Sequence, residues 1–207
     1  MKTVRVGVVS DTHCPEFLDR LPDQIAELLA GVELILHAGD VGSIETLAVL
    51  ERIAPVAAVR GDHDRGLDLP ERRVVEVGGR RIGIVHGNRS HLIEEPATFA
   101  GTLTLGHWWP KVGLYRWLRE SFPDADAVVY GHTHFADSRR LAGTLMLNPG
   151  AVYQVTPAEA RRRLERNPAW FEWTWLQVMR HRRVTPLPSV GLLEIGPSGI
   201  AASILPL

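Results

Sequence analysis

Cysteine is nearly absent from this sequence: Cys14 is the only one among 207 residues, which excludes an intrachain disulfide. A chain without disulfides fits a reducing compartment, so the expected location is the cytoplasm. Long hydrophobic runs are lacking as well. None approaches the ~18 apolar residues of a membrane span, and the first run, residues 4–9, is too short and interrupted for a signal peptide. A net charge of −1 argues against nucleic-acid binding by the chain as a whole.

The apolar residues that are present alternate between strand-like and helix-like segments in the first third of the chain. Residues 4–9, 34–37 and 56–59 are expected to be buried strands. Helical spacing is found at 21–30 and at Ser43–Ile53, whose first residue is suited to cap the helix. This alternation predicts a sheet that is largely parallel at its start.

Later segments continue the strand pattern. Residues 73–77 and 81–85 are separated by two glycines and predict a β-hairpin. The remaining expected strands are 127–130, 144–147, 190–195 and 200–204, the last two joined by a Gly-Pro-Ser-Gly turn. The chain is therefore expected to be an α/β protein with one domain, 1–207.

Acidic residues and histidines are concentrated at the points where these strands end. The candidate metal ligands are Asp11, His13, Asp40, Asp62, His86, His132 and His134. Loops at the carboxyl ends of strands in α/β sheets converge on a ligand crevice, so these side chains are expected to meet. In an extended loop, residues i and i+2 point the same way, so each Asp-Thr-His or His-Thr-His motif can aim two ligands at one place.

The chemistry of these ligands indicates the kind of ion. Imidazoles and carboxylates without thiolates suit Mn²⁺, Fe²⁺, Zn²⁺ or Ni²⁺ and fit Ca²⁺ poorly. Seven ligands are too many for one ion but suffice for two ions that share a carboxylate. Two ions about 3.5–4 Å apart can clamp a phosphate and lower the pKa of a bridging water. Any one of these residues alone could be structural, and it is their conjunction at five strand ends that predicts a dinuclear site.

The order of these motifs resembles the calcineurin-like metallophosphoesterase superfamily. The motifs are Asp11-Thr12-His13, Gly39-Asp40, Gly61-Asp62-His63-Asp64, Val85-His86-Gly87 and Gly131-His132-Thr133-His134. The small size and the Asn148-Pro149-Gly150 segment resemble its compact YfcE-like branch. The resemblance covers about 1–152 and 186–207. It implies a four-layer αββα sandwich, in which two mixed β-sheets are flanked by helices.

The resemblance also implies a role for each residue. One ion would be held by Asp11, His13, Asp40 and His134, and the other by Asp40, Asp62, His86 and His132, with Asp40 as the bridge. His63 would be catalytic, as a general acid or a hydrogen-bond donor in the transition state, and Asp64 would orient its ring. The implied reaction is hydrolysis of a small phosphomonoester or phosphodiester, nucleotides included, by a hydroxide bridging two divalent ions, of which Mn²⁺ is the first expectation.

Asp62 departs from the family pattern, which has Asn at this position. Two divalent ions are balanced by Asp11, Asp40, Asp62 and a hydroxide, whereas Asn would leave one positive charge. The second ion should therefore be held more tightly and an anionic phosphate attracted less. Asp62 also lacks the amide hydrogen-bond donor that Asn could offer a phosphate oxygen.

Two aromatic-rich stretches, about 89–122 and 153–185, are insertions relative to the compact branch and contain all six tryptophans. The expected arrangement is an accessory core or a homo-oligomer interface. The insertions could instead cap the metal site and select substrate by aromatic stacking and Arg contacts to phosphate or nucleic acid. A membrane-facing amphipathic surface is a further alternative, because the second stretch is rich in Arg and Trp.

Two other functions remain open at this point. One is a non-catalytic scaffold of the same fold, for which the aromatic insertions would be suited but the full set of ligands would not be needed. The other is a pyrophosphohydrolase that acts on nucleotide-linked lipids. Turnover of a phosphoester by the metal-loaded protein separates an enzyme from a scaffold.

Overall fold

The computed structural model describes residues 3–64, 66–88, 113–182 and 185–207. The chain divides into two compact units. The first comprises Met1–Asn88, Tyr115–Tyr153 and Leu187–Leu207, and the second Arg89–Leu114 and Gln154–Pro186. Most of the first expected insertion, with Trp108 and Trp109, lies outside the described residues.

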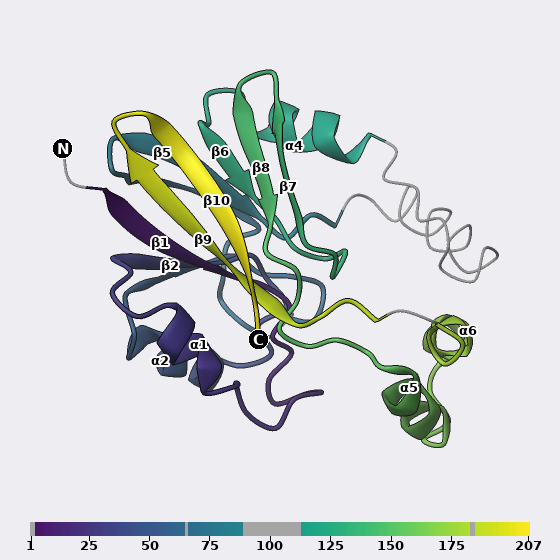
Figure 1. The fold of residues 1–207 in the computed structure, drawn as a ribbon. Helices are drawn as coiled ribbons and strands as arrows, with labels where there is room; N and C mark the ends of the chain where they lie inside the picture. The colour runs from purple at the N-terminus through teal and green to yellow at the C-terminus, as the bar shows by residue number, and fades with distance from the viewer. Residues whose placement is uncertain (1–2, 65, 89–112, 183–184) are drawn as a thin grey trace. The chain divides into compact units, whose positions relative to one another are not determined.

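The first unit contains two five-stranded sheets (Figure 1). The first sheet includes the three parallel strands of the expected βαβαβ segment. Its strand order is β10-β9-β1-β2-β3. Strands β1, β2 and β3 are parallel, whereas β9 pairs antiparallel with both β1 and β10. The bounds are β1 Val4–Val9, β2 Leu34–His37, β3 Val56–Ala58, β9 Ser189–Gly196 and β10 Gly199–Pro206.

The second sheet has the strand order β4-β5-β6-β8-β7 and is also mixed. The expected hairpin is formed by β4 and β5, while β6 pairs parallel with β5 and β8. The bounds are β4 Arg72–Val77, β5 Arg80–Val85, β6 Ala127–Val129, β7 Asp137–Leu141 and β8 Thr144–Asn148. Strand β7, an exposed edge strand, has no counterpart among the expected strands.

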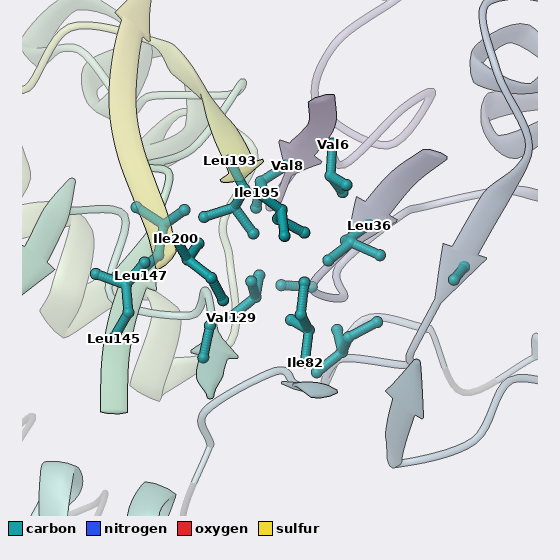
Figure 2. Packing of buried hydrophobic residues seen from close by; sticks show 14 of the residues in the cluster. Val6, Val8, Leu36, Ile82, Val129, Leu145, Leu147, Leu193, Ile195 and Ile200 are labelled. Carbon is teal, nitrogen blue, oxygen red and sulfur yellow. The ribbon is translucent and has the colours of Figure 1, made fainter. Parts of the chain in front are cut away.

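The two sheets pack face to face through one hydrophobic core (Figure 2). Val6 and Val8 of β1 point toward this core together with Leu193 of β9, and they meet Ile82 of β5 and Leu147 of β8. These five side chains are fully buried. Because alternate residues of a strand point to opposite faces, the next residues, such as Val9, are available to a second core on the outer face.

Helices cover the outer face of each sheet. On the first sheet, α1 (Gln24–Leu28) and α2 (Ile44–Glu51) bury Ile25 and Leu50 against the strands. On the second sheet, α4 (Leu114–Ser121) leads into Phe122, whose ring lies so close to Gly83 that a Cβ there would be 2.5 Å away. The predicted αββα sandwich of two mixed sheets is confirmed.

The helix boundaries match the expectations unevenly. The side chain of Ser43 accepts a hydrogen bond from the N–H of Thr46, so the predicted N-cap of α2 is confirmed. Helix α1 is shorter than the predicted span 21–30, and no side chain caps its start at Asp23. Helix α4, expected within the first insertion, belongs to the first unit from Tyr115 onward.

The described part of the second unit contains two helices, α5 (Pro157–Leu164) and α6 (Trp170–Met179). Thr156 caps α5 by accepting a hydrogen bond from the N–H of Glu159. Arg163 of α5 pairs with Glu172 of α6 at 2.5 Å and lies over the ring of Trp175. No helix in the described ranges is both long enough and apolar enough to cross a membrane.

Candidate metal centre

The strand ends of the first unit bring six of the seven candidate ligands into two groups of donors, with the seventh, Asp40, close to both. Unusual backbone angles accompany this convergence. Seven non-glycine residues in the described ranges have positive φ, and five of them are candidate ligands. These five are Asp11, His13, Asp40, His132 and His134, with φ between 46° and 65°. Such angles are uncommon outside glycine and are kept mainly where the surrounding structure fixes them for a function.

The first group contains Asp11 and His13, which follow β1, and His134, which follows β6. Each offers one donor atom, and these atoms lie within 4.8 Å of one another. Asp11 is fully buried, and its Oδ1 lies 3.3 Å from Nε2 of His134. The backbone N–H of His132 also donates to Asp11 at 3.2 Å, which ties the loop after β6 to the loop after β1.

The second group contains Asp62, His86 and His132, again with donor atoms within 4.8 Å of one another. Nδ1 of His132 lies 3.5 Å from Oδ2 of Asp62. His86 is fully buried, whereas Asp62 retains 44% of its side-chain exposure. One side of this group is therefore open to solvent.

Asp40 lies between the two groups. Its Oδ2 is 3.5 Å from Nε2 of His13 in the first group and 3.2 Å from Nε2 of His86 in the second. Its Oδ1 accepts the backbone N–H of His63 at 2.9 Å. Gly61 permits this approach, because a Cβ there would lie 2.1 Å from Oδ1 of Asp40. A carboxylate shared by two donor groups is the arrangement that a bridging ligand requires.

The ring nitrogens of His86 give independent support for a divalent-metal site. Nδ1 of His86 is 2.8 Å from the carbonyl oxygen of Ala38, to which it can donate, and this leaves Nε2 as the nitrogen that faces Asp40. Nε2 is buried and has no hydrogen-bond partner among the described residues. A buried imidazole nitrogen that faces carboxylates, with its other nitrogen held by a carbonyl, is typical of a metal ligand. The donor set contains only carboxylates and imidazoles, which suits Mn²⁺, Fe²⁺, Zn²⁺ or Ni²⁺.

Ionisation of the metal-free site follows from its burial and its charges. Burial alone would raise the pKa of Asp11, but the neighbouring His134 lowers it to about 2. Burial also opposes the ionisation of Asp40, yet the charge of His86 holds the pKa of Asp40 well below its usual range. Burial alone would lower the pKa of His86, and the negative charge of Asp40 instead raises it to about 10. A metal ion on His86 must therefore displace a proton, so ion binding is favoured as the pH rises toward 10.

His37 supports the ligand loops and is not one of the donors. Its Nδ1 accepts the backbone N–H of Gly39 at 3.2 Å, and its Nε2 lies 3.1 Å from the hydroxyl of Thr12. Burial lowers the pKa of His37 to about 4, so the ring is neutral at physiological pH. His37 thus connects the loops after β1 and β2.

Asp64, which the family resemblance pairs with the His63 ring, makes its hydrogen bonds to the backbone instead. The buried carboxylate of Asp64 accepts three backbone N–H groups, from Val41 at 3.1 Å, Gly42 at 3.0 Å and Gly61 at 2.8 Å. Two of those bonds hold the Asp64 carboxylate against the loop after β2. Among the described residues, the carboxylate that meets the His63 ring is Glu16, whose Oε2 lies 3.0 Å from Nδ1.

Two polar neighbours of the site were not expected from the sequence. Glu16 lies in an exposed loop three residues after His13, with no strand end to mark it. Asn88 lies beyond β5, and its amide donates to Oδ1 of Asp62 at 2.6 Å. The only signal for Asn88 was its place just after the Val-His-Gly motif. Its amide group is the kind of donor that Asp62 itself lacks.

Comparison with known proteins gives a consistent result. A family model described as the calcineurin-like phosphoesterase superfamily domain matches residues 4–162. A probable metallophosphoesterase of Methanothermobacter thermautotrophicus is 35% identical to the chain over 148 residues, which cover 70% of this chain and 76% of that protein. Two solved structures share the fold at lower identity. Zn²⁺-complexed Vps29 of Entamoeba histolytica has a TM-score of 0.61 at 20% identity and 97% coverage of each chain. A novel archaeal phosphodiesterase has a TM-score of 0.55 at 19% identity, over 98% of this chain and 100% of that one.

Proposed function

This chain belongs to the calcineurin-like phosphoesterase superfamily, and from that premise we propose that it hydrolyses small phosphomonoesters or phosphodiesters at a centre of two divalent metal ions. The observation that carries the proposal is the position of Asp40 between the two donor groups, with Oδ2 3.5 Å from His13 and 3.2 Å from His86. One ion would be held by the first group with Asp40, and the other by the second group with Asp40. A relative named as a probable metallophosphoesterase and a phosphodiesterase of the same fold support this class of reaction.

The residues around the ligands have separate tasks in the proposed reaction. When bound, two such cations would neutralise phosphate charge and lower the pKa of the attacking water. His63 is 41% exposed beside the first group and would give a proton to the departing alkoxide. Asp64 keeps His63 in place indirectly, because its three hydrogen bonds fix the loop from which His63 projects.

The test is an assay of p-nitrophenyl phosphate and bis-p-nitrophenyl phosphate, with the protein first stripped by chelator and then loaded with Mn²⁺, Zn²⁺ or Ni²⁺. We expect turnover of at least one substrate only after loading, with two equivalents of metal bound per chain. The scaffold alternative has two supporting observations. The same fold occurs in Vps29, whose name stands for vacuolar protein sorting 29. In this chain, Trp170 and Trp173 of α6 are 76% and 45% exposed. Two bound ions without turnover of either ester would favour a metal-binding scaffold instead of an enzyme.

Replacing Asp62 by Asn tests the charge of the second group. We expect Asp62→Asn to retain both metal ions, because an amide oxygen can still act as a ligand. We also expect it to change the ratio of diester to monoester turnover, because the site gains one positive charge and a donor next to Asn88. Metal analysis and steady-state kinetics check both points, with exposed Asp68→Asn as the control for charge. Loss of one ion would show that residue 62 is assigned the wrong role.

A further inference from the structure

We propose that Glu16 is the positioning residue for His63, holding the imidazole through Nδ1 so that Nε2 is the nitrogen presented to the leaving group. This inference rests on the proposed function, since it concerns the proton donor of that reaction. It assigns to an exposed loop residue the task that the family resemblance implies for Asp64.

The contacts of the His63 ring single out Glu16. Its two carboxylate oxygens lie 3.2 and 3.0 Å from Nδ1 of His63, and both side chains are about 40% exposed. The carboxylate is an acceptor only, so Nδ1 must carry the proton in this pair. In the neutral ring this leaves Nε2 without a proton, and in the imidazolium it makes Nε2–H the remaining donor.

Other neighbours of the His63 ring fix the plane of the ring but do not determine which of its nitrogens carries the proton. His63 packs edge-to-face on His13, with ring centroids 4.7 Å apart, and on Phe17 at 5.7 Å. Its backbone N–H is bonded to Asp40. Each of these contacts leaves the choice between the two ring nitrogens open. Glu16 therefore decides which nitrogen faces the substrate.

Glu16 also lies near the candidate ligand His13. An experiment must therefore distinguish a role of Glu16 at His63 from a role at His13. Its Oε2 is 3.8 Å from Nδ1 of His13, and that nitrogen has no hydrogen-bond partner among the described residues. A carboxylate can orient a ligand histidine through its second nitrogen. The distance to His63 is shorter by 0.8 Å, being 3.0 against 3.8 Å, so the geometry favours His63.

The first experiment compares leaving groups. For Glu16→Ala we expect kcat on phenyl phosphate to fall about 10- to 100-fold, a part of the ~10²–10⁴ that a general acid supplies. The fall on p-nitrophenyl phosphate should be only a few-fold, because that leaving group needs little protonation. Glu16→Asp, which keeps a carboxylate, should restore part of the loss, and the exposed Glu27→Gln should have no effect. Equal losses on both substrates would overturn the proposal.

A double-mutant cycle and a spectroscopic readout complete the test. Adding Glu16→Ala to His63→Ala should cause no further loss of kcat, since Glu16 acts through the ring that is already missing. A further loss together with lowered metal content would assign Glu16 to His13 and overturn the proposal. Long-range ¹H–¹⁵N spectra of the metal-free protein should show His63 protonated on Nδ1, and Glu16→Ala should redistribute that proton. An unchanged tautomer would contradict the proposal even if the protein proved to have no phosphoesterase activity.

Discussion

Asp40→Asn is expected to lower phosphoester turnover by about 1,000-fold or more and to reduce bound metal from two ions per chain to one or none. Charge stabilisation by the ions amounts to several kcal/mol in two-metal enzymes, and each ~1.4 kcal/mol is a factor of ten in rate. The position of Asp40 explains the size of this effect: its Oδ2 faces His13 in one group and His86 in the other.

The substitution keeps the shape of the side chain, which isolates the loss of charge. Oδ1 of Asp40 accepts the backbone N–H of His63 at 2.9 Å, and the amide oxygen of Asn can accept the same bond. The amide cannot supply the negative charge that raises the pKa of His86 to about 10 in the metal-free protein. Fewer protons should therefore be released when the variant binds a metal at neutral pH.

The measurements are metal content after gel filtration, kcat on both p-nitrophenyl esters, and thermal unfolding in the presence of chelator. Asp68→Asn, at an exposed position after β3, is the control for the loss of one acidic charge. Its metal content and kcat should match the wild type. Retention of two ions by Asp40→Asn with kcat within tenfold of wild type would contradict the bridging role.

Most of the fold could be predicted because its strands are apolar and bounded by turns. The exception is β7, with the sequence Asp-Ser-Arg-Arg-Leu, which pairs only with β8 at the edge of the second sheet. Four of its five residues are exposed, so hydrophobic patterning gave no signal. Its stability depends on hydrogen bonds to β8 and on Arg139, which pairs with Asp137 and covers the ring of Tyr115. The contact with Tyr115 joins residues that are far apart in the chain, so the local sequence does not indicate it.

The convergence of the seven candidate ligands could be predicted because it depends only on where strands end. The contacts of His63 could not. Asp64 is the sequence neighbour of His63, but the turn from Gly61 to Asp64 sends the two side chains in different directions. The partner of the ring comes from Glu16, 47 residues earlier in the chain. Sequence adjacency fixes which backbone atoms are close, whereas the pairing of side chains depends on how separate loops pack.

His63→Ala is expected to separate proton donation from metal binding. We expect kcat on a poor leaving group such as phenyl phosphate to fall about 10²- to 10⁴-fold, which is the contribution of a positioned general acid. The fall on p-nitrophenyl phosphate should be smaller. Both metal ions should remain, because the variant keeps the backbone N–H that donates to Asp40 and removes no member of the two donor groups.

Metal analysis and a series of aryl phosphates of increasing leaving-group pKa measure the two effects together. The dependence of log kcat on leaving-group pKa should be steeper in His63→Ala than in the wild type, since the alkoxide then leaves without a proton. His181→Ala, at an exposed position after α6, controls for the loss of an imidazole. Loss of an ion from His63→Ala would instead place the ring among the ligands, next to His13 and Glu16, whose donor atoms it approaches within 4.8 Å. A parallel fall on all leaving groups, with both ions retained, would show that His63 stabilises the transition state without giving up a proton.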